Sequence, residues 1–165
     1  MFDWLTVLAI LIGPVFALST QRLLDRIREK KNRRAAIYLT LMSLRATPLH
    51  PDHVKALNTL DTVFSGRGPR DQKVRKAWEN ALTHVNTRRE GTDIEKTAWD
   101  NRLIDLRVDL YQAVGRAVGY DHSVEYIKGH IYMPMYYSDA EVDQIKIRAG
   151  LAKILTEDGL KVIVQ

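Results

Sequence analysis

The stretch WLTVLAILIGPVFALSTQ, residues 4–21, decides how this chain of 165 residues is organised. It contains 18 consecutive uncharged residues, close to the roughly 20 that a helix needs to cross the hydrocarbon of a bilayer. Its nine Leu, Ile, Val and Phe residues together favour insertion by roughly 3 to 5 kcal/mol as an upper bound. We therefore expect residues 1–21 to form one transmembrane anchor. The residues assigned to this span are Trp4, Leu8, Leu11, Gly13, Pro14 and Phe16.

The charges that flank this run predict its orientation. Only Asp3 is charged before the run, and the nearby cations all follow it. A cleaved signal peptide begins with a basic segment, so the sequence favours a retained anchor over cleavage. The positive-inside rule predicts that the amino terminus lies outside and that the rest of the chain lies in the cytoplasm. A helix of a soluble protein, buried between subunits, is the alternative to a membrane span.

The next stretch, RLLDRIREKKNRR (residues 22–34), has seven cations and two acids, so its net charge of +5 equals that of the whole chain. The remaining residues are therefore balanced, and nucleic acid is not expected as a partner. Helix-forming residues without Gly or Pro predict a continuous helical stalk over residues 22–46. Anionic lipid headgroups, pairing between the stalks of an oligomer, or plain solvation would each suit its cations. These cations are Arg22, Arg26, Arg28, Lys30, Lys31, Arg33 and Arg34.

Residues 47–165 predict a cytoplasmic domain built of helices, so the expected fold class is all-α. Apolar residues at helical spacing between Ala35 and Leu44 would pack the end of the stalk on this domain. Capping boxes predict two of the helix starts, at Thr92 and at Ser138. The helices are expected over 51–64, about 70–85, 92–118, near 124–127 and 138–155, with a short strand over 160–164. Their expected buried faces include Val54, Leu57, Leu60 and Phe64 in the first, and Val74, Leu82 and Val85 in the second.

Several motifs of this domain carry a family resemblance. They are His53-Val54-Lys55-Ala56-Leu57-Asn58 with Asp61 and Phe64, Trp78, Gly119-Tyr120, Tyr132-Met133-Pro134 and Ile147-Arg148-Ala149-Gly150-Leu151. The chain resembles an uncharacterised bacterial family of short helical proteins, a domain of unknown function that often follows one spanning helix. The resemblance covers most of residues 50–155. It implies a helical fold and attachment to a membrane, which in bacteria would be the inner membrane, and it implies no activity.

Residues able to do chemistry are scattered along the chain. There is no cysteine, which removes disulfides, thiolate metal sites and cysteine nucleophiles. His50 and His53 are three residues apart, but Pro51 lies between them and no nearby carboxylates complete a metal site. No phosphate-binding glycine loop, nucleophile elbow or zinc-protease motif is present. We therefore expect no metal, no cofactor and no catalytic residue.

Two stretches are candidate interaction surfaces. A basic cluster would suit an anionic partner, although a solvated helix face explains it as well. Its cations include Arg67, Arg70 and Lys73. A patch rich in tyrosine and methionine suits an adaptable contact surface, and closure of this loop over the domain's own core explains it equally well. Its tyrosines are Tyr132, Tyr136 and Tyr137.

These features favour a membrane-anchored interaction or scaffold protein at the inner face of a bacterial membrane. Its expected partners are anionic membrane lipids, a second copy of itself and an unidentified protein. A membrane-acting effector that forms an oligomeric pore, of defence or toxin type, is a second hypothesis. A third is an anchored enzyme, which would show a deep pocket with carboxylates or histidines of shifted pKa.

Overall fold

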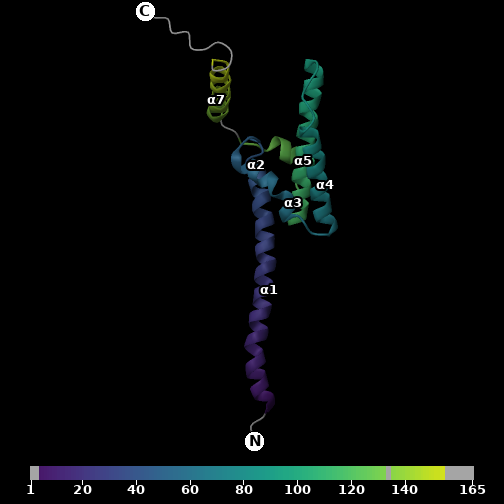
Figure 1. Cartoon of the computed structure of the whole chain (residues 1–165), viewed down its shortest axis with the longest axis vertical. Coiled ribbons are helices and arrows are strands. Elements are labelled where there is room, and N and C mark those ends of the chain that lie inside the picture. The colour runs from purple at the N-terminus through teal and green to yellow at the C-terminus, as the bar shows by residue number, and fades with distance from the viewer. Residues whose placement is uncertain (1–3, 133–134, 155–165) are drawn as a thin grey trace, which may run out of the picture. The chain divides into compact units, whose positions relative to one another are not determined.

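The computed structural model describes the backbone of residues 4–132 and 135–154, and the side chains of residues 13, 16–132 and 142–154. Every regular element in this part of the chain is a helix, which confirms the all-α prediction (Figure 1). The strand expected over 160–164 lies outside the described residues. The helices are α1 (Trp4–Ser43), α2 (Pro51–Asn58), α3 (Leu60–Val63), α4 (Pro69–Val85), α5 (Asp93–Val118), α6 (Val124–Gly129) and α7 (Met135–Lys153).

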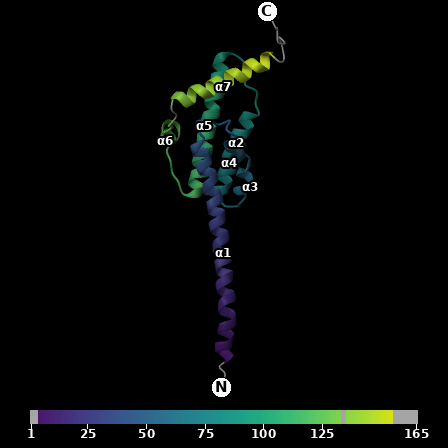
Figure 2. The ribbon, with the colours of Figure 1, turned by 90° about the vertical axis from the view of Figure 1, so that its left-hand side faces the viewer.

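The chain divides into two units, Met1–His130 and Ile131–Gln165. In the first unit α1 is a single helix of 40 residues that passes through Gly13 and Pro14 (Figures 1 and 2). The prediction that the basic stretch 22–34 continues a helix without a break is therefore confirmed. Among the residues that the structure describes, no helix is both long enough and apolar enough to cross a membrane.

The expected helix over 51–64 is two helices, α2 and α3, separated at Thr59. The Thr59 hydroxyl donates to the Ala56 carbonyl oxygen over 2.9 Å, and such bonds between side chain and backbone compete with helical pairing. The predicted inward face of α2 is wrong at Val54, which is 41% exposed, whereas the neighbouring His53 is buried. The spacing of apolar residues predicted burial of the aliphatic Val54 and gave no reason to expect burial of the polar His53. In the folded domain, contacts with other helices bury His53 instead.

Helices α4 and α5 form an antiparallel hairpin. The capping box of Thr92 with Glu95 is present as predicted, and Gly119 ends α5 in the left-handed conformation with a φ of 101°. The expected burial of Leu82 and Val85 is wrong, because both are exposed toward the end of α4. Ala81, one residue before Leu82, is still buried at 3% exposure, so burial along α4 is lost at Leu82 and Val85 within its last turns.

The two C-terminal helices fit the predictions in part. The short element near 124–127 is confirmed as α6, and the Ser123 hydroxyl caps it by accepting from the Tyr126 backbone N–H over 3.2 Å. The second capping box is wrong, because α7 begins at Met135 and Ser138 is already inside the helix. The sequence between Met135 and Ser138 contains no Gly or Pro, so nothing in it prevents the helix from beginning before the predicted cap.

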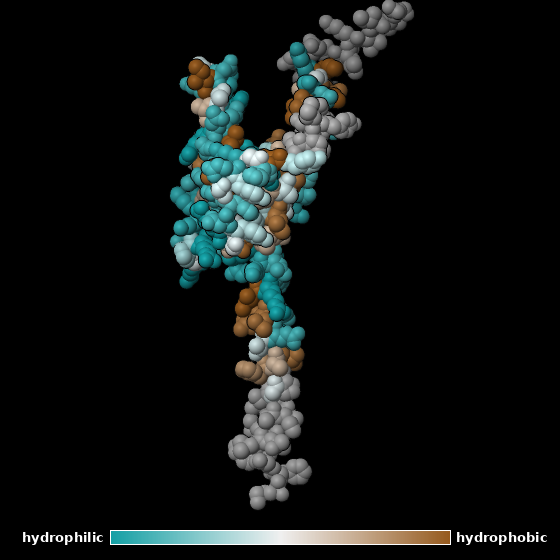
Figure 3. All heavy atoms as spheres, turned by 180° about the vertical axis from the view of Figure 1, so that it is seen from behind, coloured by the Kyte–Doolittle hydropathy of each residue, from teal (hydrophilic) through white to brown (hydrophobic). Residues whose placement is uncertain are grey.

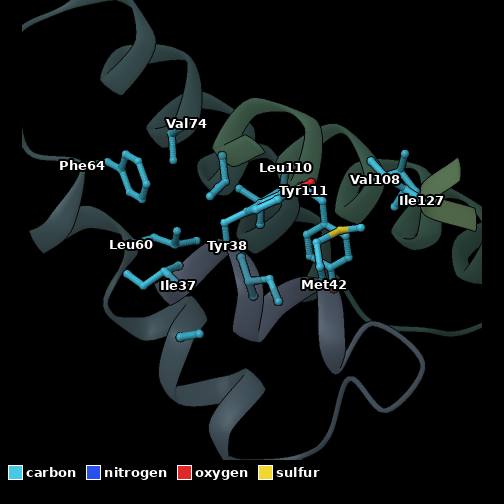
Figure 4. Packing of buried hydrophobic residues seen from close by; sticks show 13 residues of the cluster. Ile37, Tyr38, Met42, Leu60, Phe64, Val74, Val108, Leu110, Tyr111 and Ile127 are labelled. Carbon is cyan, nitrogen blue, oxygen red and sulfur yellow. The ribbon is translucent and has the colours of Figure 1, made fainter. Parts of the chain in front are cut away.

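The hydrophobic core of the first unit gathers side chains from α1, the α2–α3 segment, α4, α5 and α6 (Figure 4). The last turns of α1 supply Ile37, Tyr38, Leu41 and Met42, all buried, as predicted for the distal end of the stalk. Gly115 of α5 admits the Tyr38 ring, since a β-carbon there would lie 3.0 Å from the ring. The end of α1 is therefore an integral part of this core.

Truncation of the core tests this packing. Leu110 is fully buried in α5, so we expect Leu110→Ala to lower the free energy of unfolding by about 2 to 5 kcal/mol. Ile94→Ala near the start of the same helix is the matched control, because Ile94 is exposed and should change the value by less than about 0.5 kcal/mol. Denaturant unfolding followed by circular dichroism measures both, and equal effects would contradict the core described here.

Candidate functional site

A buried ion pair joins α1 to the start of α4. Arg34 Nη2 lies 2.5 Å from Asp71 Oδ2, and the two side chains are 15% and 8% exposed. The same Asp71 oxygen accepts from the Gly66 backbone N–H over 2.9 Å. The Arg34 guanidinium also lies 4.9 Å from the centre of the Phe64 ring, within cation–π range. Arg34, expected to pair with a second stalk or to stand in solvent, thus has a partner in its own chain.

The turn between α3 and α4 is held by a second arginine. Arg75 Nη1 donates to the Gly66 carbonyl oxygen over 2.9 Å and also to the Phe64 carbonyl oxygen. Gly66 leaves room for this arrangement, because a β-carbon there would collide with the Asp71 carboxylate. The turn, Asp71 and Arg34 therefore form one polar network that fixes the stalk against the helical hairpin.

Beside this network lie two adjoining hollows, of about 550 and 500 Å³, which share Arg70, Ala117 and Gly119 in their walls. Three helices build them: α1, the first turns of α4 and the end of α5. We call them together the basic groove. Its cations are Lys30, Lys31, Arg34, Arg70, Lys73 and Arg116, and the rest of its lining includes Ile27, Asp109, Gln112, Ala113, Val118, Tyr120 and Asp121.

The charges in the basic groove are unbalanced. Arg34 is paired with Asp71, and Arg116 Nε donates to Asp121 Oδ1 over 2.9 Å. Among the described side chains, no carboxylate lies within ion-pair distance of the other cations. These unpaired cations are Lys30, Lys31, Arg70 and Lys73. In the sequence they belong to two separate basic groups, and the fold brings members of both groups to one place.

The other stalk cations have exposed side chains. Arg28 pairs with Asp25 over 3.9 Å and Arg33 with Glu29 over 3.5 Å, both along the helix and with exposed side chains. Arg22 and Arg26 are exposed as well. Both pairs join residues on successive turns of one helix, at the i, i+3 and i, i+4 spacings.

One predicted interaction residue of the first unit lies outside the basic groove. Arg67 is exposed in the turn before α4, outside the lining of the two hollows. Tyr132 belongs to the second unit, and its side chain is 92% exposed. The side chains of Tyr136 and Tyr137 lie outside the described residues.

A buried histidine is the polar centre of the core. His53 Nε2 lies 2.7 Å from the Tyr111 hydroxyl oxygen. Burial lowers the pKa of His53, although the Pro48 carbonyl favours the charged ring, and burial raises the pKa of Tyr111 to about 12. Both groups are therefore neutral near pH 7, and the contact serves packing between α2 and α5. Among the described residues no cluster of three metal-ligating side chains exists.

Five aromatic rings form a stack that sequence analysis did not foresee. Tyr126 of α6 lies between His122 and His130, with ring centres 4.3 and 4.6 Å away. Tyr120 continues the stack to Tyr38 of α1, at 5.0 Å. The spacing of four residues between the last three rings is a helix-face signal that could have been found in the sequence. The stack holds α6 against the end of α1.

The low pKa of His53 predicts a pH dependence of stability. The unfolded chain takes up a proton at His53 as the pH falls below about 6.5, whereas the folded chain resists it. The free energy of unfolding should therefore fall as the pH is lowered from 7 to 5.5, by at most about 1.4 kcal/mol per pH unit from this group. His53→Gln should flatten that slope. Denaturation curves at several pH values check this, and an unchanged slope in His53→Gln would refute it.

The ion pair predicts an asymmetric response to substitution. Arg34→Met leaves the Asp71 carboxylate without its partner, and we expect a loss of about 3 to 5 kcal/mol in the free energy of unfolding. Arg33→Met, which removes an exposed pair one residue away, should cost less than about 1 kcal/mol. The double variant Arg34→Met with Asp71→Leu should recover part of the loss. Additive losses in this double-mutant cycle would show that the pair does not couple the two helices.

Comparison with known proteins places the chain in a family. Residues 1–164 match a family of unknown function, DUF6680, a longer stretch than the motifs between 50 and 155 suggested. No curated protein and no solved structure matches the chain. Because the match covers nearly every residue, the chain belongs to the family of unknown function DUF6680.

Proposed function

We propose that this protein is a membrane-anchored interaction protein, in which α1 is both the anchor and the stalk of a helical domain. The observation that carries the proposal is the continuity of α1. One unbroken helix leads from the apolar run 4–21 through the basic stretch into the core at Tyr38 and Leu41. A helix that is rigid from the anchor to the core would hold the domain at a fixed height and orientation above the surface.

The apolar run is the part that needs lipid. Most of its apolar side chains, at positions 4–12 and 15, lie outside the described residues, and the proposal takes their character from the sequence. Phe16, at the described end of the run, is 72% exposed. A helix that carries this much apolar surface is poorly suited to water. Lipid would cover it and would supply the roughly 3 to 5 kcal/mol of insertion free energy.

The basic stretch sets the proposed orientation. Arg22, Arg26 and Arg28 lie within about 10 Å of Gln21 along an upright helix, close enough to attract anionic headgroups at roughly 1 kcal/mol each. By the positive-inside rule the amino terminus is outside and the helical domain is in the cytoplasm, at the inner membrane of a bacterium. Arg34, about 20 Å from Gln21, begins the contact with the domain.

The exposed stalk supports self-association. Leu23, Leu24 and Ile27 are all exposed on α1 before it enters the domain, and Figure 3 shows apolar surface on this part of the helix. A second copy of the stalk would cover these side chains, as apolar seams do in helix pairs. An unidentified protein is the other proposed occupant. The alternatives of an oligomeric pore and of an anchored enzyme stay predictions.

Fractionation of lysed cells tests the anchor. The full chain should sediment with membranes and should resist extraction by alkaline carbonate. Leu11→Arg places a charge inside the apolar run at a cost of about 3 kcal/mol, which nearly cancels the insertion free energy, so this variant should move to the supernatant. Leu39→Arg is the matched control, because Leu39 is exposed on the same helix beside the domain. A wild-type chain that stays in the supernatant as a monomer would refute the proposal.

A further inference from the structure

We infer that the basic groove is a binding site for a phosphate group, carried either by an anionic lipid headgroup or by a free phosphorylated molecule. The inference deepens the proposed function and rests on it for the position of the groove near a membrane. Its basis is the convergence of cations from α1, α4 and α5 on hollows that are large enough for a ligand.

The dimensions of the groove suit a phosphorylated headgroup. Ligand sites in proteins typically measure about 300 to 1,000 Å³, and the two hollows measure about 550 and 500 Å³. Small residues form part of the wall, namely Ala113, Ala117 and Gly119, so a ligand could approach the backbone of α5 closely. Arg70 lines both hollows and could contact a ligand in either.

The donors in the groove suit phosphate. Arg70 and Lys73 are three residues apart on α4, so both project from one face of the helix and could hold one group between them. An arginine presents paired N–H donors that match two phosphate oxygens, and a lysine adds a point charge.

The carboxylates of the groove do not cancel this field. Asp121 is engaged by Arg116 and Asp71 by Arg34, which leaves Asp109 as the one lining acid without an ion pair among the described residues. Four cations of the groove without an ion pair stand against this one acid, which leaves an excess of three positive charges. These cations are Lys30, Lys31, Arg70 and Lys73. Solvation of each helix face by itself does not explain why cations from two helices that are distant in sequence line the same hollow.

The groove lies at the end of the domain that faces along α1 toward the anchor. In Figures 1 and 2 the α3–α4 turn and the end of α5 lie on this side, whereas the α4–α5 turn lies at the opposite end of the hairpin. Ile27 and Lys30 are about 9 and 14 Å from Gln21 along an upright helix, and the headgroup layer extends about 5 to 7 Å beyond the hydrocarbon. The part of the groove lined by Ile27 and Lys30 is thus within side-chain reach of the headgroups.

The test compares two double variants of the full chain. Arg70→Ala with Lys73→Ala removes two cations from the groove. Lys76→Ala with Arg102→Ala removes the same two types of residue from another hollow between α4 and α5, and it is the matched control. One arm titrates each protein in neutral detergent with inorganic pyrophosphate by calorimetry. The other measures hydrogen exchange over residues 66–73 and 115–121 in nanodiscs of phosphatidylcholine, with and without phosphatidylglycerol.

We expect the groove variant to bind pyrophosphate at least tenfold more weakly than the wild type, or to lack the several-fold slowing of hydrogen exchange that phosphatidylglycerol causes in the wild type. The control variant should keep both values within twofold of the wild type. Loss in the first arm identifies a free phosphorylated ligand, and loss in the second alone identifies a lipid headgroup. Either result supports the site. Equal effects of the two double variants, or no effect of either probe on the wild type, would overturn it.

Two further outcomes distinguish this inference from nucleic-acid binding and from the proposed membrane anchor. A single-stranded RNA oligonucleotide that binds the wild type more tightly than pyrophosphate, and is lost in the groove variant, would make nucleic acid the partner and overturn the proposal. Failure of the chain to enter nanodiscs would refute the membrane anchor, whereas the pyrophosphate titration would still decide whether the groove binds phosphate.

Discussion

The burial of the last turns of α1 inside the helical domain is the contact on which the rest of the structure depends. Ile37, Tyr38, Leu41 and Met42 fill the space between the α2–α3 segment and α5, so the domain has no complete core without the stalk. Arg34 adds a polar contact just below these residues, through Asp71. Apolar burial supplies the stability, and the ion pair, whose formation requires desolvation of both charges, fixes how the helices meet.

Much of the fold could be predicted because its signals are local. The capping box at Thr92, the glycine stop at Gly119 and the absence of helix breakers between 22 and 34 each act over a few residues. The same local rules were wrong at Ser138, where a helix started earlier, and at Val54, where a neighbouring polar side chain was buried. In both cases the local sequence pattern did not include the residues or contacts that decide the outcome.

The candidate site could be predicted only in pieces. The cations of the stalk and those of α4 are visible as two clusters, but Arg34 and Asp71 are 37 residues apart, and nothing in either cluster indicates that they meet. The ring stack from Tyr38 to His130 likewise joins residues that are distant in sequence. Sequence spacing identifies which side chains share a helix face, whereas the assembly of faces from different helices depends on the tertiary fold.

The continuity of α1 also ties the direction in which the domain faces to the number of residues in the stalk. Each residue of an α-helix turns the chain by about 100° and advances it by about 1.5 Å. Removing one residue between Arg22 and Arg33 would hardly change the height of the domain, yet it would swing the groove about a quarter of the way around the helix axis. The number of residues in the stalk therefore sets the rotation of the domain about the helix axis, and so determines which side of the domain meets a neighbour.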